Sequence, residues 1–289
     1  MVIPRESAAK KLISVVQLGT IDYATGLCLQ QRLVELRKEG RIGDVLLLLE
    51  HTPVITLGRN AKSKNILASP ELLAQRGVEV FECDRGGDVT FHGPGQLVGY
   101  PISDLRGFGT SDGKRKTLGA IEYVRKLEEV LIRTCADFGI SANRIPGLTG
   151  VWTDGPCRGG SSTRPDGAEP RPHTEQQTAK IAAIGVHISR AVTSHGFALN
   201  VNTDLSYFDL IVPCGIESKP VTSMAKELGK QIALQEVAHS LARSFGAVFE
   251  SQILWLESLD TLLSETIGVP MRPPAELRKI HGDDDTTWA

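Results

Sequence analysis

The chain has 289 residues, 41% of them hydrophobic, and its formal net charge at pH 7 is −2. This length allows one sizeable core or a large domain with a small lobe. A nearly neutral chain gives no electrostatic reason to expect nucleic acid or an anionic membrane as a partner. No apolar run approaches transmembrane length, and residues 1–12 lack the apolar segment of a signal peptide.

The cysteines are widely spread and form no C-x-x-C pair, so the sequence predicts neither a disulfide framework nor a zinc site. They are Cys28, Cys83, Cys135, Cys157 and Cys214. We therefore expect a soluble protein of the reduced cytoplasm, with no metal site.

Hydrophobic periodicity predicts strands and helices through most of the chain. Alternating or short continuous apolar runs predict strands at residues 12–18, 44–50, 54–57, 78–83, 150–153, 180–189 and 196–201. Apolar residues three and four apart, with capping and stop residues at the ends, predict helices at residues 22–39, 69–77, 117–138, 222–228, 233–245 and 247–264.

Residues 84–102 are rich in glycine and proline but also carry apolar residues, which predicts a tight hairpin inside the fold. Gly86 and Gly87 would let a ligand approach the backbone closely, and Arg85 could hold a carboxylate, a phosphate or a carbonyl. His92 lies at the bend. Local chemistry alone favours a structural turn with a hydrogen-bonded histidine, and the glycines fit no nucleotide-phosphate motif.

Two further residues suggest chemistry. Lys180 shares the alternation of residues 180–189, so its amine is expected in a partly dry place that favours the uncharged form. Cys214 lies between Pro213 and Gly215, which can present its sulfur at a bend. Together they would form a nucleophile and its base. Taken singly, a cysteine is more often a small buried hydrophobe, and a lysine that opens a strand is usually solvated.

Residues 154–178 contain several glycines and prolines and almost nothing apolar, which predicts a flexible loop. Cys157 and His173 within it are too few to form a metal site. We expect the loop to be dispensable, so that deleting residues 156–176 leaves activity largely intact. The chain after Pro270 is expected to be mobile.

Five segments resemble, in order, the blocks of one enzyme family. They are EHTPVITLGR at residues 50–59, RGGDVTFHGPGQ at 85–96, KIAAIG at 180–185, SHGFALNV at 194–201 and PCG at 213–215. The family is the octanoyltransferases, also called lipoyl(octanoyl) transferases or lipoate-protein ligase B, and the resemblance covers roughly residues 15–250. It implies an α/β (α+β) fold with mixed sheets flanked by helices, as in the catalytic domains of biotin and lipoate ligases. We expect one catalytic domain at residues 1–268, with an insertion at 154–178 and a mobile tail at 269–289.

The resemblance also implies an activity. The family moves an octanoyl or lipoyl group from acyl carrier protein to a specific lysine of lipoyl domains, in 2-oxoacid dehydrogenase complexes and the glycine cleavage H protein. Its cysteine corresponds to Cys214 and its lysine to Lys180. The implied acyl pocket consists of Arg85, Gly86, Gly87, His92, Ala183, Ile184, Gly185, Gly196 and Ala198. No cofactor is expected, and we expect a monomer.

Three other functions remain open at this stage. An ATP-dependent lipoate or biotin ligase would need an adenylate-binding loop such as GRGRxxR, which the chain lacks, and would depend on ATP. A thioesterase using Cys214 and a histidine would release free octanoate. A non-catalytic binding module would keep its function after Cys214→Ser and Lys180→Ala.

Overall fold

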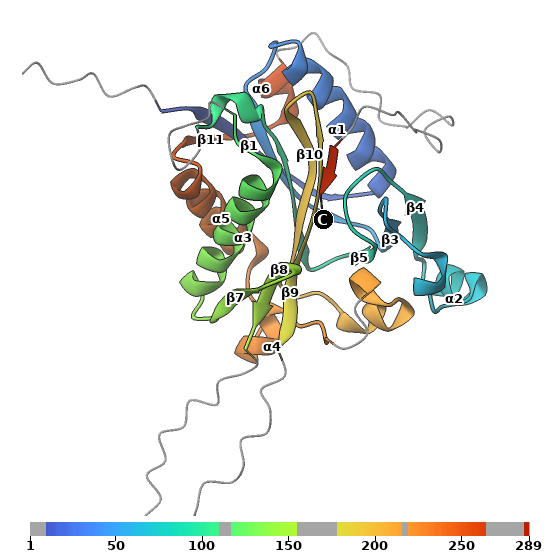
Figure 1. Cartoon of the computed structure of the whole chain (residues 1–289). Coiled ribbons are helices and arrows are strands. Elements are labelled where there is room, and N and C mark those ends of the chain that lie inside the picture. Colours follow the sequence, from blue (N-terminus) through green and yellow to red (C-terminus); the bar gives the residue numbers. More distant parts are fainter. Residues whose placement is uncertain (1–9, 110–116, 155–177, 216–218, 264–285, 289) are drawn as a thin grey trace, which may run out of the picture.

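The structure is a computed structural model, and it describes residues 10–109, 117–154, 178–215, 219–263 and 286–288. A mixed sheet runs through the molecule (Figure 1). Its strands, in spatial order, are β11 (Gln252–Leu256), β1 (Leu12–Ile21), β2 (Asp44–His51), β6 (Gln96–Ile102), β10 (Val192–Asn200), β9 (Ala179–Ser189), β8 (Leu148–Thr153) and β7 (Ala142–Ile145). The first three strands are parallel to one another, and the other neighbours are antiparallel.

Helices cover both faces of this sheet. Figure 1 shows α3 (Ala120–Asp137) and α5 (Leu234–Val248) on one face and α1 (Tyr23–Lys38) on the other, where α6 (Leu259–Leu263) also packs. Strand β2 shows why both faces of the sheet must be covered, because its residues are buried on both faces. Alternate side chains of a strand point to opposite faces. Leu46 and Leu48 accordingly join the core under α3 and α5, whereas Val45, Leu47 and Leu49 join the core under α1.

A second, smaller sheet stands beside the main one. It consists of β4 (Glu79–Glu82), β3 (Val54–Leu57) and β5 (Val89–His92), with α2 (Pro70–Gln75) next to it (Figure 1). The hairpin predicted for residues 84–102 is therefore wrong. Strand β5 pairs with β3, whereas β6 pairs with β2 and β10. Every residue of β5 and β6 is buried. An isolated two-stranded hairpin could not bury both strands in this way. Each strand is buried because it belongs to a different sheet.

The chain after α5 also differs from the prediction. Residues 247–264 are not one helix, because α5 ends at Val248 and Glu250 takes a positive φ of 53°. The next residues form β11, which pairs with β1 at the edge of the sheet, and α6 follows. Strand β7 was not predicted.

The remaining predicted elements are confirmed within a few residues at their ends. The strand predicted at 180–189 is Ala179–Ser189, and the helix predicted at 117–138 is Ala120–Asp137. Residues 155–177 of the predicted loop, with Cys157 and His173, and most of the predicted tail lie outside the described residues. Three tail residues are described: Thr286–Trp288 form β12, which pairs with β9. In the described chain no helix is long and apolar enough to cross a membrane.

Candidate active site

A pocket of about 470 Å³, partly open to solvent, lies between the main sheet and the smaller one. Its walls come from β6, β9 and β10, from β5 and the loop before it, and from the first residue of α1. Eight of the nine predicted binding residues line it, and so does Cys214. The eight are Arg85, Gly87, His92, Ala183, Ile184, Gly185, Gly196 and Ala198. The ninth, Gly86, supports the loop that forms one wall.

Small residues on two neighbouring strands make room for the pocket. Ala183 of β9 pairs with Ala198 of β10, and Gly185 pairs with Gly196. Gly185 cannot carry a side chain, because a Cβ there would lie 2.7 Å from the carbonyl oxygen of Gly86. The sequence thus lets the loop before β5 lie directly on the sheet while leaving space beside it.

Arg85 is fixed in the wall of the pocket and is only 7% exposed. Its Nε and Nη2 donate to Thr56 Oγ1 at 3.1 and 2.9 Å, Nη2 also donates to the Thr56 carbonyl at 2.7 Å, and Nη1 donates to the Gly86 carbonyl at 2.9 Å. The backbone N–H of Gly86 donates to the Val186 carbonyl of β9 at 3.1 Å. All these acceptors are uncharged, so they hold the guanidinium without neutralising it.

The structure brings Lys180 and Cys214 together. Lys180 Nζ donates to Cys214 Sγ at 3.1 Å, although 34 positions separate the two residues in the chain. Lys180 is 8% exposed, and its Nζ lies 5.1 Å from the centre of the Trp152 ring. Gly150 leaves space for the lysine, because a Cβ there would lie 2.7 Å from Lys180 Cε.

The backbone around Lys180 is fixed as well. Its N–H donates to the Pro220 carbonyl at 2.8 Å, and its carbonyl accepts from the N–H of Thr222 at 2.9 Å. These two bonds tie the start of β9 to the segment that follows the Cys214 turn in the chain. The position of the amine relative to the thiol is therefore set by backbone contacts on both sides.

Cys214 lies in a strained turn. It is the middle residue of a short 3₁₀ turn, Pro213–Gly215, and has φ 56° and ψ 20°, a conformation rare outside glycine. Its neighbour Gly215 also has a positive φ, of 67°, and donates its N–H to the Val212 carbonyl at 3.1 Å. Strain of this kind persists where the surroundings fix it, often at reactive sites.

His92 is held as a neutral ring. Its Nδ1 lies 2.8 Å from Gln96 Oε1, which can only accept, so Nδ1 carries the proton. Burial, with repulsion from His51 when that ring is protonated and from Arg85, lowers the pKa of His92 to about 3. Gln96 Nε2 donates to Asn200 Oδ1 at 2.8 Å, and Asn200 Nδ2 donates to the Thr222 carbonyl at 3.0 Å. This chain of bonds links His92 to the segment that holds Lys180.

Several pocket-lining residues were not predicted, His195 among them, and neither was Asp84, which lies behind the pocket wall and holds His195 by a hydrogen bond. Asp84 accepts a hydrogen bond from His195 Nε2 at 2.6 Å and another from His187 Nδ1. Burial raises the pKa of the Asp84 carboxyl, but the two histidine hydrogen bonds outweigh it and hold that pKa well below its usual range. His195 lines the pocket with φ 55°. His195 lies within the quoted segment at residues 194–201, and Asp84 directly precedes the segment at 85–96, so their positions in the sequence were the available signal.

Tyr23 also lines the pocket, and nothing in the sequence distinguished it from an ordinary first residue of a helix. No group of three or more histidine, cysteine or acidic side chains suited to a metal ion occurs within the described ranges.

Comparison with known proteins defines the class. Residues 22–246 match the family model described as the lipoyl protein ligase A/B catalytic domain. Two solved structures share the fold. A bi-partite lipoate protein ligase from Thermoplasma acidophilum superposes with a TM-score of 0.60 at 15% identity, and the match covers 87% of each chain. Lipoate-protein ligase A bound with ATP superposes with a TM-score of 0.59 at 14% identity, and the match covers 87% of this chain and 89% of that chain. The expected fold class is confirmed.

Relatives with higher identity narrow the assignment. An octanoyltransferase of Koribacter versatilis (strain Ellin345) is 59% identical over 273 residues, which cover 94% of this chain and 98% of the relative. An octanoyltransferase of Acidobacterium capsulatum is 59% identical over 256 residues, which cover 88% and 97%. The chain therefore belongs to the lipoyl protein ligase A/B family and, within it, to the octanoyltransferases, which are acyltransferases of protein lipoylation.

Proposed function

We propose that the protein transfers an octanoyl or lipoyl group from acyl carrier protein to a specific lysine of lipoyl domains, through a thioester on Cys214. The acceptors would be the lipoyl domains of 2-oxoacid dehydrogenase complexes and the glycine cleavage H protein. The observation that carries the proposal is the 3.1 Å contact between Lys180 Nζ and Cys214 Sγ, at the edge of a pocket floored by small residues. A thiolate suits this chemistry because it is both a nucleophile and a leaving group.

In the first half-reaction, Lys180 takes the proton of the Cys214 thiol. The thiolate attacks the carbonyl carbon of the carrier thioester, and a new bond forms between that carbon and Cys214 Sγ. The bond between the carbonyl carbon and the carrier sulfur then breaks, and the carrier thiolate leaves with the proton from Lys180. Proton transfer by a positioned amine of this kind contributes about 10²–10⁴-fold to such a step.

In the second half-reaction, the acceptor lysine attacks the same carbonyl carbon as a neutral amine. An amide bond forms, the bond to Cys214 Sγ breaks, and Lys180 carries the amine's proton to the departing thiolate. The atoms balance without ATP or a bound cofactor. We propose that none is needed and that the protein acts as a monomer.

The pocket residues receive roles from their positions. The octanoyl chain would lie on the floor formed by the Ala183–Ala198 and Gly185–Gly196 pairs, against the wall held by Arg85. His92 would act through its fixed ring and not as a base, because a pKa of about 3 makes the ring a weak base and its unprotonated Nε2 lies 3.4 Å from the Thr56 hydroxyl. This arrangement also disfavours a thioesterase that pairs Cys214 with a histidine, since the contact made by the thiol is with Lys180.

Initial-rate kinetics test the proposal. Octanoyl-acyl carrier protein and apo lipoyl domain are both varied without ATP, and a lipoyl domain whose acceptor lysine is replaced by arginine serves as control. Transfer with parallel double-reciprocal lines supports the two half-reactions. Intersecting lines would indicate a ternary complex, and a requirement for ATP would indicate a ligase.

A further inference from the structure

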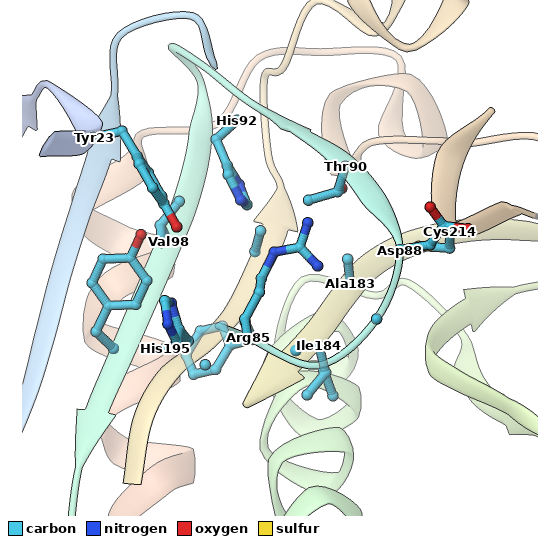
Figure 2. Close-up of a pocket in the computed structure, with 16 residues that line it drawn as sticks. Tyr23, Arg85, Asp88, Thr90, His92, Val98, Ala183, Ile184, His195 and Cys214 are labelled. Carbon is cyan, nitrogen blue, oxygen red and sulfur yellow. The ribbon is translucent and has the colours of Figure 1, made fainter. Parts of the chain in front are cut away.

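The pocket has a closed end on the side away from Cys214. Figure 2 shows Cys214 at one side and Tyr23, Val98 and His195 at the other, with Arg85 between them. A smaller neighbouring cavity confirms this order. Cys214 lines both cavities, as do Thr90, Ala183 and Ala198, whereas Tyr23 and Tyr100 line only the larger one.

Tyr23 is held firmly at this closed end. It is the first residue of α1 and follows Asp22, whose carboxylate accepts from the N–H of Thr25 at 2.8 Å and from its hydroxyl at 2.7 Å. This cap fixes the start of the helix, and with it the backbone of Tyr23. The ring is 1% exposed and lies 5.2 Å from the His51 ring and 5.4 Å from the Phe81 ring, centre to centre.

A second aromatic layer supports Tyr23. The hydroxyl of Tyr100 donates to His51 Nε2 at 2.7 Å, and His51 Nδ1 donates to the Ile21 carbonyl at 3.0 Å. Burial lowers the pKa of His51 to about 4, so the neutral ring keeps both bonds. Gly26 makes room for this layer, because a Cβ there would lie 2.9 Å from His51 Cε1. The end wall therefore cannot retreat without breaking a packed and hydrogen-bonded cluster.

A pocket with a reactive sulfur at one end and a rigid wall at the other has a fixed length. A chain with more methylenes must displace Tyr23, and a chain with fewer leaves space unfilled. In a hydrophobic pocket, one extra or missing methylene changes kcat/KM by about 10- to 200-fold. We infer that Tyr23, supported by His51 and Tyr100, is the specificity-determining residue that sets the length of the transferred acyl group. The inference rests on the proposed function.

The experiment compares kcat/KM for hexanoyl, octanoyl, decanoyl and dodecanoyl carrier proteins, with apo lipoyl domain as acceptor. Wild type should prefer octanoyl over decanoyl by more than about 10-fold. Tyr23→Ala should change the decanoyl-to-octanoyl ratio by at least about 10-fold in favour of decanoyl. Tyr23→Trp, with a larger ring, should change the preference towards hexanoyl. These ratios are independent of the fraction of folded enzyme.

Leu33→Ala is the matched control, because Leu33 is a buried residue of α1 that does not line the pocket. It should lower stability and leave the chain-length ratios unchanged. Where Tyr23→Ala fails to fold, Tyr23→Leu carries the same test. Unchanged ratios in the folded Tyr23 variants would overturn the inference. A wild-type protein that transfers no acyl group from any carrier would instead overturn the proposed function.

Discussion

The two ends of the pocket are built from different kinds of backbone. At the reactive end, Cys214 lies in a short turn with φ 56°, is half-buried, and meets a lysine from the start of a strand. At the closed end, Tyr23 and Tyr100 lie in a helix and a strand and are 1% and 4% exposed. In the proposed mechanism the reactive end admits two protein substrates in turn, and its position on an accessible turn suits that role. The closed end only has to hold its shape, so it belongs to the core.

The largest effect is expected from removing the sulfur. Cys214→Ala should lower the rate of octanoyl transfer by more than about 10³-fold, because no group remains to form the thioester. Cys28→Ala is the control. Cys28 lies in α1, burial raises the pKa of its thiol, and its loss should leave transfer intact. Comparable losses of octanoyl transfer in Cys214→Ala and Cys28→Ala would contradict a specific role of the Cys214 thiol in forming the thioester.

A somewhat smaller effect is expected at the amine. Lys180→Met should lower kcat by about 10²–10⁴-fold and change the pH profile of the remaining activity, since the proton carrier is gone. Lys230→Met, at an exposed position, serves as control. A Lys180→Met enzyme that keeps the wild-type pH profile would remove Lys180 from the proton transfers.

A third prediction distinguishes two effects of replacing a glycine near the reactive end: backbone strain and displacement of the Lys180 side chain. Gly150 and Gly147 both have positive φ values, 121° and 81°, but a Cβ at position 150 would lie 2.7 Å from both Lys180 Cε and the Ala182 carbonyl oxygen, whereas one at position 147 has nothing within 4 Å. The strained φ alone should cost about 1–3 kcal/mol of stability with alanine at either position, and Gly150→Ala should cost more than Gly147→Ala because of the contact with the Ala182 carbonyl. Gly150→Ala should in addition lower kcat by about 10- to 100-fold, because it displaces the lysine. Equal rates in the two variants would contradict the packing role of Gly150.

The smallest effect is expected in the pH dependence of folding stability, to which the buried histidines near the closed end contribute. Burial lowers the folded-state pKa of His51 to about 4 and that of His92 to about 3, from 6.5. The unfolded chain therefore binds more protons as the pH falls below about 6.5, so stability decreases from about pH 6.5 towards pH 4. Each histidine contributes a slope of up to about 1.4 kcal/mol per pH unit.

Urea denaturation at a series of pH values measures this slope. His51→Gln should reduce it by up to about 1.4 kcal/mol per pH unit. The exposed His239→Gln should keep the wild-type slope. A His51→Gln protein with the wild-type slope would show that His51 does not remain neutral in the fold.

The sequence predicted the reactive end better than the closed end, for a physical reason. Lys180 and Cys214 became candidates through distinctive neighbours, a strict alternation after the lysine and proline and glycine around the cysteine, and the family resemblance then supplied their expected roles. Both patterns reflect local backbone conformation, which depends mainly on adjacent residues. Tyr23 gave no such signal, because its position at the end wall depends on contacts with His51 and Phe81, which lie far away in the chain.

The errors in the fold have the same origin. The turn between β5 and β6 was recognised from its glycines, but the pairing of the strands depends on which sheet each one completes. Residues 253–256 carry apolar side chains that suit a helix or a strand. These residues form a strand because they pair with β1 at the sheet edge, and a local sequence pattern does not indicate that pairing.

The most direct test of the proposed mechanism is the intact mass of the protein after mixing with octanoyl-acyl carrier protein, measured beside Cys214→Ser. Wild type should gain the mass of one octanoyl group, the variant should gain none, and addition of apo lipoyl domain should remove the gain from wild type. A Cys214→Ser protein that octanoylates the lipoyl domain at the wild-type rate would contradict a thioester on Cys214.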